Sequence, residues 1–201
     1  MAIYVFHHIP KCGGTTSRHA FKKWFRVVGD YRTDVSPEAT EFFLKNTLDL
    51  SSLDEDCLLT GHFELEGAHL HQRYPEILSN DRFRLITFVR DPLEVAQSLY
   101  FYERATRHPY PYHSLSERLD SLENYMASIF PCTEDNYKSV IDRYFFVGLT
   151  ECLQESFDIL ARMIDKPAGF NRWVLTLDPR WDFFRDDERF NDLIRPLSLV
   201  E

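Results

Sequence analysis

The sequence has few glycines, and its cysteines follow no recognisable spacing. Only 7 Gly occur in 201 residues, and two of them, Gly13 and Gly14, are adjacent. The four cysteines form no CxxC pair and no metal-ligand spacing, which excludes a disulfide framework or a zinc site as the basis of the fold. They are Cys12, Cys57, Cys132 and Cys152. We therefore expect a reducing, cytoplasmic setting and no bound metal.

The chain also lacks long apolar stretches and an excess of positive charge. No run of about 18 apolar residues is present, and the first apolar stretch is too short for a signal peptide, so we expect no membrane segment. The net charge is -9, which argues against a nucleic-acid partner because such binding uses clustered Lys and Arg. Between Lys11 and Arg32, however, basic residues predominate and Asp30 is the only acid. This local positive field suits a small anion.

What the chain does contain is typical of a soluble globular protein. Hydrophobic residues make up 44% and charged residues 27%, with no internal repeat, low-complexity tract or linker. The length fits one domain spanning residues 1–201. Predicted strands alternate with predicted helices, which indicates an α/β fold with a mostly parallel sheet flanked by helices. The strands are expected at residues 2–7, 57–60, 83–89, 144–149 and 173–177, and the helices at 15–28, 37–45, 67–74, 92–104, 115–130, 151–164 and 184–194.

The first motif with chemical content lies between the first predicted strand and helix. Residues 8–16 read HIPKCGGTT. The adjacent glycines let backbone N–H groups approach an anion, and the start of the helix adds a favourable dipole. Lys11 contributes a positive charge, and Thr15 and Thr16 contribute hydroxyl groups. The order differs from the GxxxxGK[ST] loop of nucleoside triphosphatases, because the lysine precedes the glycines.

A second motif follows the strand at residues 83–89. Arg90 is placed where a buried strand ends, which is the ligand-binding edge of an open parallel sheet. Its guanidinium can bind a phosphate through two N–H groups. Asp91 and Pro92 are typical of a helix start, and Ser98 lies about two helical turns further on. Taken alone, Arg90 could also pair with a carboxylate, and Ser98 could be an ordinary small helix residue.

A third motif, Gly61-His62, follows the strand at residues 57–60. A histidine at this edge can act as a general base because its pKa is close to neutrality. A lone histidine is more often structural, and Glu64 and Glu66 are alternative bases.

The order of these motifs resembles the PAPS-dependent sulfotransferases (PAPS is 3′-phosphoadenosine 5′-phosphosulfate). HIPKCGGTT resembles their 5′-phosphosulfate loop, and the run FVRDPLEVAQSLYFY resembles the 3′-phosphate motif of the branch that includes heparan sulfate 2-O- and 6-O-sulfotransferases. VGLTE at residues 147–151 resembles a later strand-to-helix segment of the same fold. The resemblance extends to about residue 164.

The resemblance implies a role for each matching residue. Lys11, Gly13, Gly14, Thr15 and Thr16 would hold the 5′-phosphosulfate. Cys12 falls in the same loop where the family usually has Thr or Ser, so a hydroxyl donor is replaced by a weak thiol donor. Arg90 and Ser98 would hold the 3′-phosphate. Lys11 would stabilise the leaving oxygen, and His62 would take the proton of an acceptor hydroxyl without a metal.

Three matters remain open at this stage. The acceptor could be a carbohydrate, a small metabolite or a peptidyl tyrosine, and residues 103–116 could form a flap over it or a solvated loop. A nucleotide kinase and a non-catalytic PAPS- or nucleotide-binding protein are the alternative functions. The adenine-binding residues are not identified beyond three candidates, which are Lys166, Arg172 and Arg180.

Overall fold

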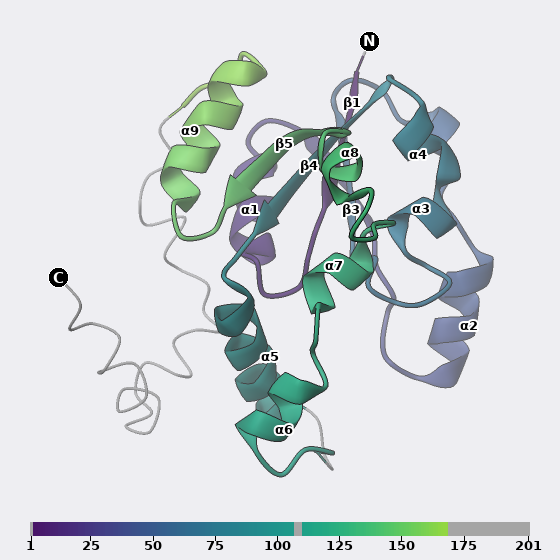
Figure 1. Cartoon of the computed structure of the whole chain (residues 1–201). Coiled ribbons are helices and arrows are strands. Elements are labelled where there is room, and N and C mark those ends of the chain that lie inside the picture. The colour runs from purple at the N-terminus through teal and green to yellow at the C-terminus, as the bar shows by residue number, and fades with distance from the viewer. Residues whose placement is uncertain (1, 107–109, 169–201) are drawn as a thin grey trace, which may run out of the picture.

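The described residues of the computed structural model, 2–106 and 110–168, form one α/β domain around a five-stranded sheet (Figure 1). All neighbouring strands are parallel, and their order is β2-β3-β1-β4-β5. This confirms the predicted fold class. The strands are β1 (Ile3–His7), β2 (Arg26–Asp30), β3 (Cys57–Gly61), β4 (Phe83–Val89) and β5 (Tyr144–Leu149).

Helices cover both faces of the sheet. On one face, α1 and α9 pack on the sheet through side chains such as Phe21 and Phe157. On the other face, α3, α4, α5 and α7 contribute to a second cluster of buried side chains. The helices are α1 (Gly14–Phe21), α2 (Pro37–Lys45), α3 (Leu70–Arg73), α4 (Pro75–Ser79), α5 (Pro92–Thr106), α6 (Leu115–Asp120), α7 (Tyr125–Ile129), α8 (Tyr137–Ile141) and α9 (Leu153–Met163), with a 3₁₀ turn, η1 (Leu50–Ser52).

The central strand β1 explains why its sequence is almost continuously apolar. Successive side chains of a strand point to opposite faces of the sheet. Ile3 and Val5 belong to one buried cluster, whereas Phe6 belongs to the other. A parallel strand covered by helices on both faces therefore has no polar face.

The prediction of a helix through residue 28 was wrong. Helix α1 ends at Phe21, and after a turn the chain forms the edge strand β2 (Arg26–Asp30), which pairs with β3. The apolar spacing up to Phe25 fits a helix, but Val27 and Val28 are β-branched and pair with Leu58 and Leu59 of β3. Pairing across the sheet, which is not visible in local spacing, decides this segment.

The segment at residues 115–130 is also not one helix. It divides into α6 and α7, with Asn124 in the left-handed backbone region at φ 53° before α7. The short helix α8 was not predicted. The strand expected at residues 173–177 and the helix expected at 184–194 lie outside the described residues. Within the described part of the chain, no helix is long and apolar enough to cross a membrane.

Candidate active site

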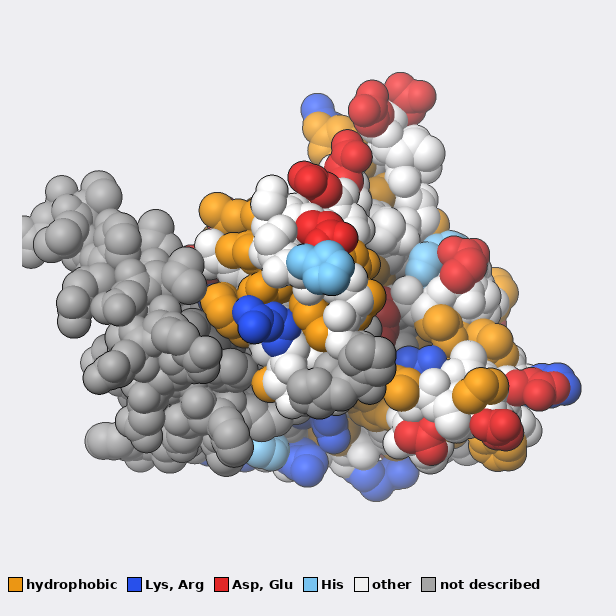
Figure 2. Space-filling view, turned by 90° about the horizontal axis from the view of Figure 1, so that it is seen from below, with side chains coloured by type: hydrophobic (Ala, Val, Ile, Leu, Met, Phe, Trp, Pro, Cys, Tyr) orange, Lys and Arg blue, Asp and Glu red, His pale blue; other side chains and the backbone are white. Residues whose placement is uncertain are grey.

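A large cavity lies at the edge of the sheet where the parallel strands end. Its volume is about 1360 Å³. The residue that directly follows each of the five strands lines it: His8, Tyr31, His62, Arg90 and Thr150. Figure 2 looks onto this edge and shows a recess between the surface of α5 and α6 and the surface of α2. The sheet therefore brings together side chains from across the whole chain, as the ligand-binding edge of an open parallel sheet does.

The glycine-rich loop provides an anion-binding helix start. Gly13, Gly14, Thr15 and Thr16 all line the cavity, and Gly13 adopts φ 70° at the N-terminal end of α1. The first N–H groups of a helix have no partner within it, and the first turn of α1 contains no acidic residue. This part of the cavity therefore suits a phosphate or sulfate group.

Gly14 has a second property that depends on its missing side chain. A Cβ at this position would lie 1.5 Å from Nε2 of His8, so the imidazole occupies the space directly against the loop. His8 is 6% exposed and its ring stacks on Phe6. The second glycine is required for contact between α1 and the end of β1.

Lys11 is held in an uncommon backbone conformation beside the loop. Its φ is 66°, in the left-handed region, which costs a non-glycine residue about 1 kcal/mol or more and is characteristic of functional sites. Its ammonium nitrogen lies 4.4 Å from the centroid of the Tyr102 ring. The charge is therefore directed into the cavity, between the loop and α5.

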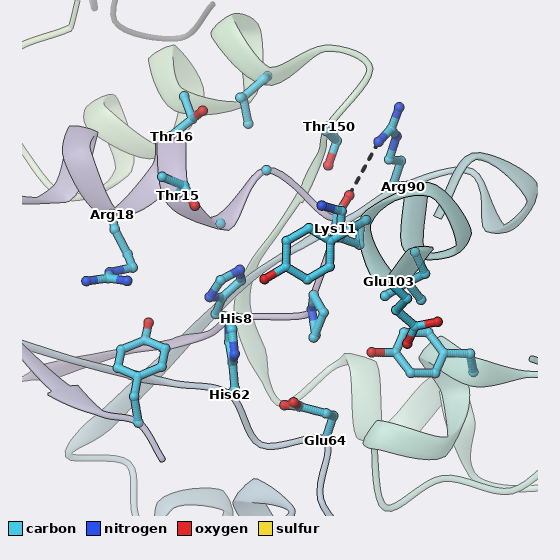
Figure 3. Close-up of a pocket in the computed structure, with 18 of the residues that line it drawn as sticks. His8, Lys11, Thr15, Thr16, Arg18, His62, Glu64, Arg90, Glu103 and Thr150 are labelled. Carbon is cyan, nitrogen blue, oxygen red and sulfur yellow. Dashed lines mark hydrogen bonds between the residues drawn. The ribbon is translucent and has the colours of Figure 1, made fainter. Parts of the chain in front are cut away.

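Arg90 lies at the same end of the cavity and contacts the loop. One of its terminal nitrogens donates to the carbonyl of Lys11 at 3.4 Å, as Figure 3 shows. Its Nε donates to Glu94 at 2.8 Å. The two predicted phosphate motifs are thus adjacent. Ser98, predicted to act with Arg90, is half-buried on α5 and is not among the residues that line the cavity.

Cys12 is directed away from the cavity. Its side chain is 1% exposed, lies in the core, and donates to the sulfur of Met126 at 3.9 Å. Burial raises the pKa of the thiol to about 12, and its backbone N–H donates to Ile9. A cysteine in place of Thr or Ser at this position therefore removes a hydroxyl from the core and not from the cavity.

His62 is half-buried and stands between two rings. Its ring centroid lies 4.4 Å from that of His8 and 5.0 Å from that of Tyr31. Figure 3 shows Glu64 on the same side of the cavity. One oxygen of the Glu64 carboxylate is buried and has no hydrogen-bond partner among the described residues. The other candidate base, Glu66, is exposed, bonds Gln72 and does not line the cavity.

An ion pair lies beside the described part of residues 103–116. Arg118 of α6 donates two hydrogen bonds of 2.9 Å to Glu103 of α5, and both side chains are largely buried. Both residues line the cavity. Tyr112 packs against the Arg118 guanidinium at 4.8 Å. Tyr112 and α6 are therefore held beside α5 at one side of the cavity.

The remaining sequence-based candidates lie elsewhere. The ammonium group of Lys166 lies 5.5 Å from the Phe25 ring and does not line the cavity. Arg172 and Arg180 are outside the described residues. Among residues 2–106 and 110–168, no cluster of three or more His, Cys, Asp or Glu side chains is arranged to hold a metal ion.

Several cavity residues have no role predicted from the sequence. His8 lies in the motif at residues 8–16, and Arg18 lies in the basic stretch between Lys11 and Arg32. Thr150 was part of the VGLTE segment. The signal for His8 and Thr150 is their position, because the residue that follows each strand lies at this edge of the sheet. The pattern is complete only once β2 is recognised as a strand.

The structure is similar to solved structures of other proteins. Mouse sulfotransferase SULT7A1 complexed with PAP has a TM-score of 0.51 and 10% identity, with 86% of this chain and 61% of that chain covered. A sulfotransferase from Alicyclobacillus acidocaldarius has a TM-score of 0.46, 12% identity, and coverage of 85% and 83%. Retinol dehydratase in complex with androsterone and inactive cofactor PAP has a TM-score of 0.47, 13% identity, and coverage of 83% and 60%.

No protein-family model matches the sequence, and no curated protein matches it either. The match to the mouse enzyme shows that the described residues adopt the sulfotransferase fold. This chain spans about three fifths of the mouse protein, 61% of its length.

Proposed function

We propose that this protein is a sulfotransferase that transfers a sulfuryl group from PAPS to an acceptor hydroxyl. The observation that carries the proposal is that two candidate anion-binding elements meet in one cavity. One is the glycine-rich loop that contains Lys11, and the other is Arg90 at the end of the neighbouring strand β4. A donor with phosphate groups at both its 5′ and 3′ positions needs two such elements. The sulfotransferase fold supports the same conclusion.

The residues of the loop fit the 5′-phosphosulfate. Gly13 and Gly14 allow the group to approach the start of α1, where N–H groups and the helix dipole favour negative charge. Thr15 and Thr16 add hydroxyl donors, and Lys11 stabilises charge on the bridging oxygen as its bond to sulfur breaks. Arg90 binds the 3′-phosphate, which replaces the Glu94 carboxylate as the hydrogen-bond partner of its guanidinium.

His62 is the proposed general base. It accepts the proton of the acceptor hydroxyl while the hydroxyl oxygen forms a bond to sulfur. The bond between sulfur and the phosphate oxygen breaks, and 3′-phosphoadenosine 5′-phosphate (PAP) leaves. Positioning and electrostatic stabilisation by these side chains provide the catalysis.

The acceptor site is the part of the cavity next to His62. Tyr31 contacts His62, Tyr102 and Tyr125 line the same cavity, and the three rings can pack against a sugar or an aromatic alcohol. The buried oxygen of Glu64 can accept a hydrogen bond from the acceptor. Arg118 is neutralised by Glu103, so it does not favour a polyanionic acceptor. These features favour a compact hydroxyl compound, such as a small carbohydrate, over a long sulfated polysaccharide.

Calorimetry with PAP, ADP and ATP tests the donor. We expect PAP to bind more tightly than ADP or ATP, and Arg90→Ala to weaken PAP binding about 10- to 100-fold because a charge-assisted hydrogen bond is lost. Stronger or equal binding of ATP would favour a nucleotide kinase. Unchanged PAP affinity in Arg90→Ala would refute the assignment of the 3′-phosphate site.

Two control variants sharpen this measurement. Arg26→Ala removes an exposed arginine that pairs with Asp54 and does not line the cavity, so PAP affinity should not change. Glu94→Gln should raise PAP affinity, since it releases Arg90 from its carboxylate partner. Turnover of PAPS with a panel of hydroxyl compounds then separates an enzyme from a non-catalytic PAPS-binding protein.

A further inference from the structure

We infer that His8 and His62 act as one coupled imidazole pair, in which His8 is a positioning residue for His62. The pair takes up its two protons in separate steps, and the second proton binds only at clearly lower pH than the first. Its role in catalysis rests on the proposed function, whereas the pairing itself does not.

The geometry of the pair comes from the ends of two adjacent strands. β1 and β3 are neighbours in the sheet, with His7 paired to Gly61, so the next residues, His8 and His62, emerge side by side. Their ring centroids are 4.4 Å apart at an interplanar angle of 60°. At this separation two positive charges repel strongly, and interacting groups lose their protons in two steps that belong to the pair.

A column of aromatic contacts fixes both rings. Phe6 stacks on His8 at 5.5 Å, and His8 contacts His62. His62 in turn meets the Tyr31 ring edge-on at 5.0 Å, and Arg18 lies 4.7 Å from the centroid of Tyr31. The hydroxyl of Tyr31 is hydrogen-bonded to Thr60 at 3.0 Å. His62 is therefore clamped between two ordered rings, and removal of His8 opens one side of the clamp.

His8 also connects this pair to the glycine-rich loop. Its ring fills the space that a side chain at Gly14 would occupy, so it stands against the first turn of α1. Neighbouring positive charge and the N-terminal end of α1 both disfavour a second proton on the pair. The charged and titratable side chains around the pair are Lys11 of the loop, Arg18 of α1, Tyr31 after β2, Glu64 after β3 and Tyr102 of α5.

This arrangement has a direct use for a general base. A base must be unprotonated before the reaction and must accept one proton during it. In the pair, His62 receives the proton of the acceptor hydroxyl. At a pH above the first step both imidazoles are neutral, so His62 can accept the proton of the acceptor hydroxyl as the single proton of the pair.

NMR titration of the histidine ring protons tests the pair in the full-length protein without any ligand. We expect the His8 and His62 signals to show two-step curves separated by about one pH unit or more. In His62→Asn, the His8 curve should become a single step displaced by a similar amount, and His8→Asn should do the same to His62. The exposed His19 provides the matched control, since His19→Asn should leave both curves unchanged.

Single-step curves in the parent that do not respond to the partner's replacement would overturn the inference. The two-step curve of the parent needs no variant, so the test does not depend on whether His8→Asn folds. Its outcome is independent of the donor measurement: PAP can bind to a protein whose histidines titrate separately, and the pair can exist in a protein that does not bind PAP.

Discussion

His7 and His8 are neighbours in the sequence, but the sheet gives them different environments. His8 lines the cavity, whereas His7 lies on the other face of the sheet, where its Nδ1 is 2.7 Å from the hydroxyl of Tyr144. Burial lowers the pKa of His7 from 6.5 to about 3, with smaller contributions from His69 and His71. Successive side chains of an extended chain point to opposite faces of the sheet, which explains the difference. The prediction of a strand here is therefore enough to predict that the two side chains lie on opposite faces.

The low pKa of His7 predicts that the protein loses stability as the pH falls. Below about pH 6.5 the unfolded chain takes up a proton at His7, while the folded protein stays neutral there until about pH 3. The free energy of unfolding should therefore decrease by about 1.4 kcal/mol per pH unit from this residue between these values. In urea titrations from pH 7.5 to 4.5, the free energy of unfolding should depend less on pH in the double variant His7→Phe/Tyr144→Phe than in the parent protein.

The control for this prediction is Tyr144→Phe alone, which keeps His7 and removes only its hydrogen-bond partner. It should retain the slope of the parent protein. An identical slope in the parent and the double variant would show that His7 is not the group responsible.

At the level of elements, the glycine-rich turn and α1 show what local sequence can and cannot determine. The loop was predicted correctly as a turn between β1 and a helix, because adjacent glycines and threonines define it locally. The length of α1 was not, since the residues after it gain more from pairing with β3 than from continuing a helix. The roles of Lys11 and Arg90 remain predictions, although the fold brings them into one cavity.

Alanine substitutions at the two glycines should differ in their effects. Gly14→Ala places a methyl group into the His8 ring and should destabilise the protein by about 1–3 kcal/mol through overpacking. His8→Ala in the same chain should restore much of this loss by making room. Gly13→Ala meets no atom closer than 3.5 Å and should cost about 1–2 kcal/mol through its φ of 70° alone.

Denaturant unfolding of the parent protein, Gly14→Ala, Gly13→Ala and the double variant His8→Ala/Gly14→Ala measures these differences. If His8→Ala fails to rescue Gly14→Ala, then the contact between the imidazole and the loop is not the cause of the loss.

At the scale of the whole molecule, a buried ion pair fixes the edge of the sheet beside the cavity. Asp30, the last residue of β2, accepts hydrogen bonds of 2.6 and 2.9 Å from Arg73. Tyr74 donates to the same carboxylate at 2.7 Å. Arg73 also donates to the carbonyls of Phe43 and Asn46, each at 2.6 Å. This network joins β2, α2 and α3 and determines where Tyr31 enters the cavity.

Replacement of Asp30 should therefore destabilise the whole domain. Asp30→Ala leaves the Arg73 guanidinium buried without its carboxylate, which costs about 3–5 kcal/mol in comparable buried pairs. Arg26→Ala breaks the exposed pair with Asp54 and should have little effect. Thermal unfolding should show a large decrease in Tm for Asp30→Ala only, and equal shifts for the two variants would contradict a structural role for this network.

The sequence alone determined the α/β class, four of the five strands, and the loop and arginine on which the functional proposal rests. These features depend on local signals: apolar runs for strands covered on both faces, glycine pairs for a close backbone approach, and strand ends for ligand contacts. Only the tertiary structure decided that β2 is a strand and that Cys12 faces the core while His8 faces His62. Those outcomes depend on pairing between β2 and β3 and between β1 and β3, because neighbouring strands bring together residues that are far apart in the chain.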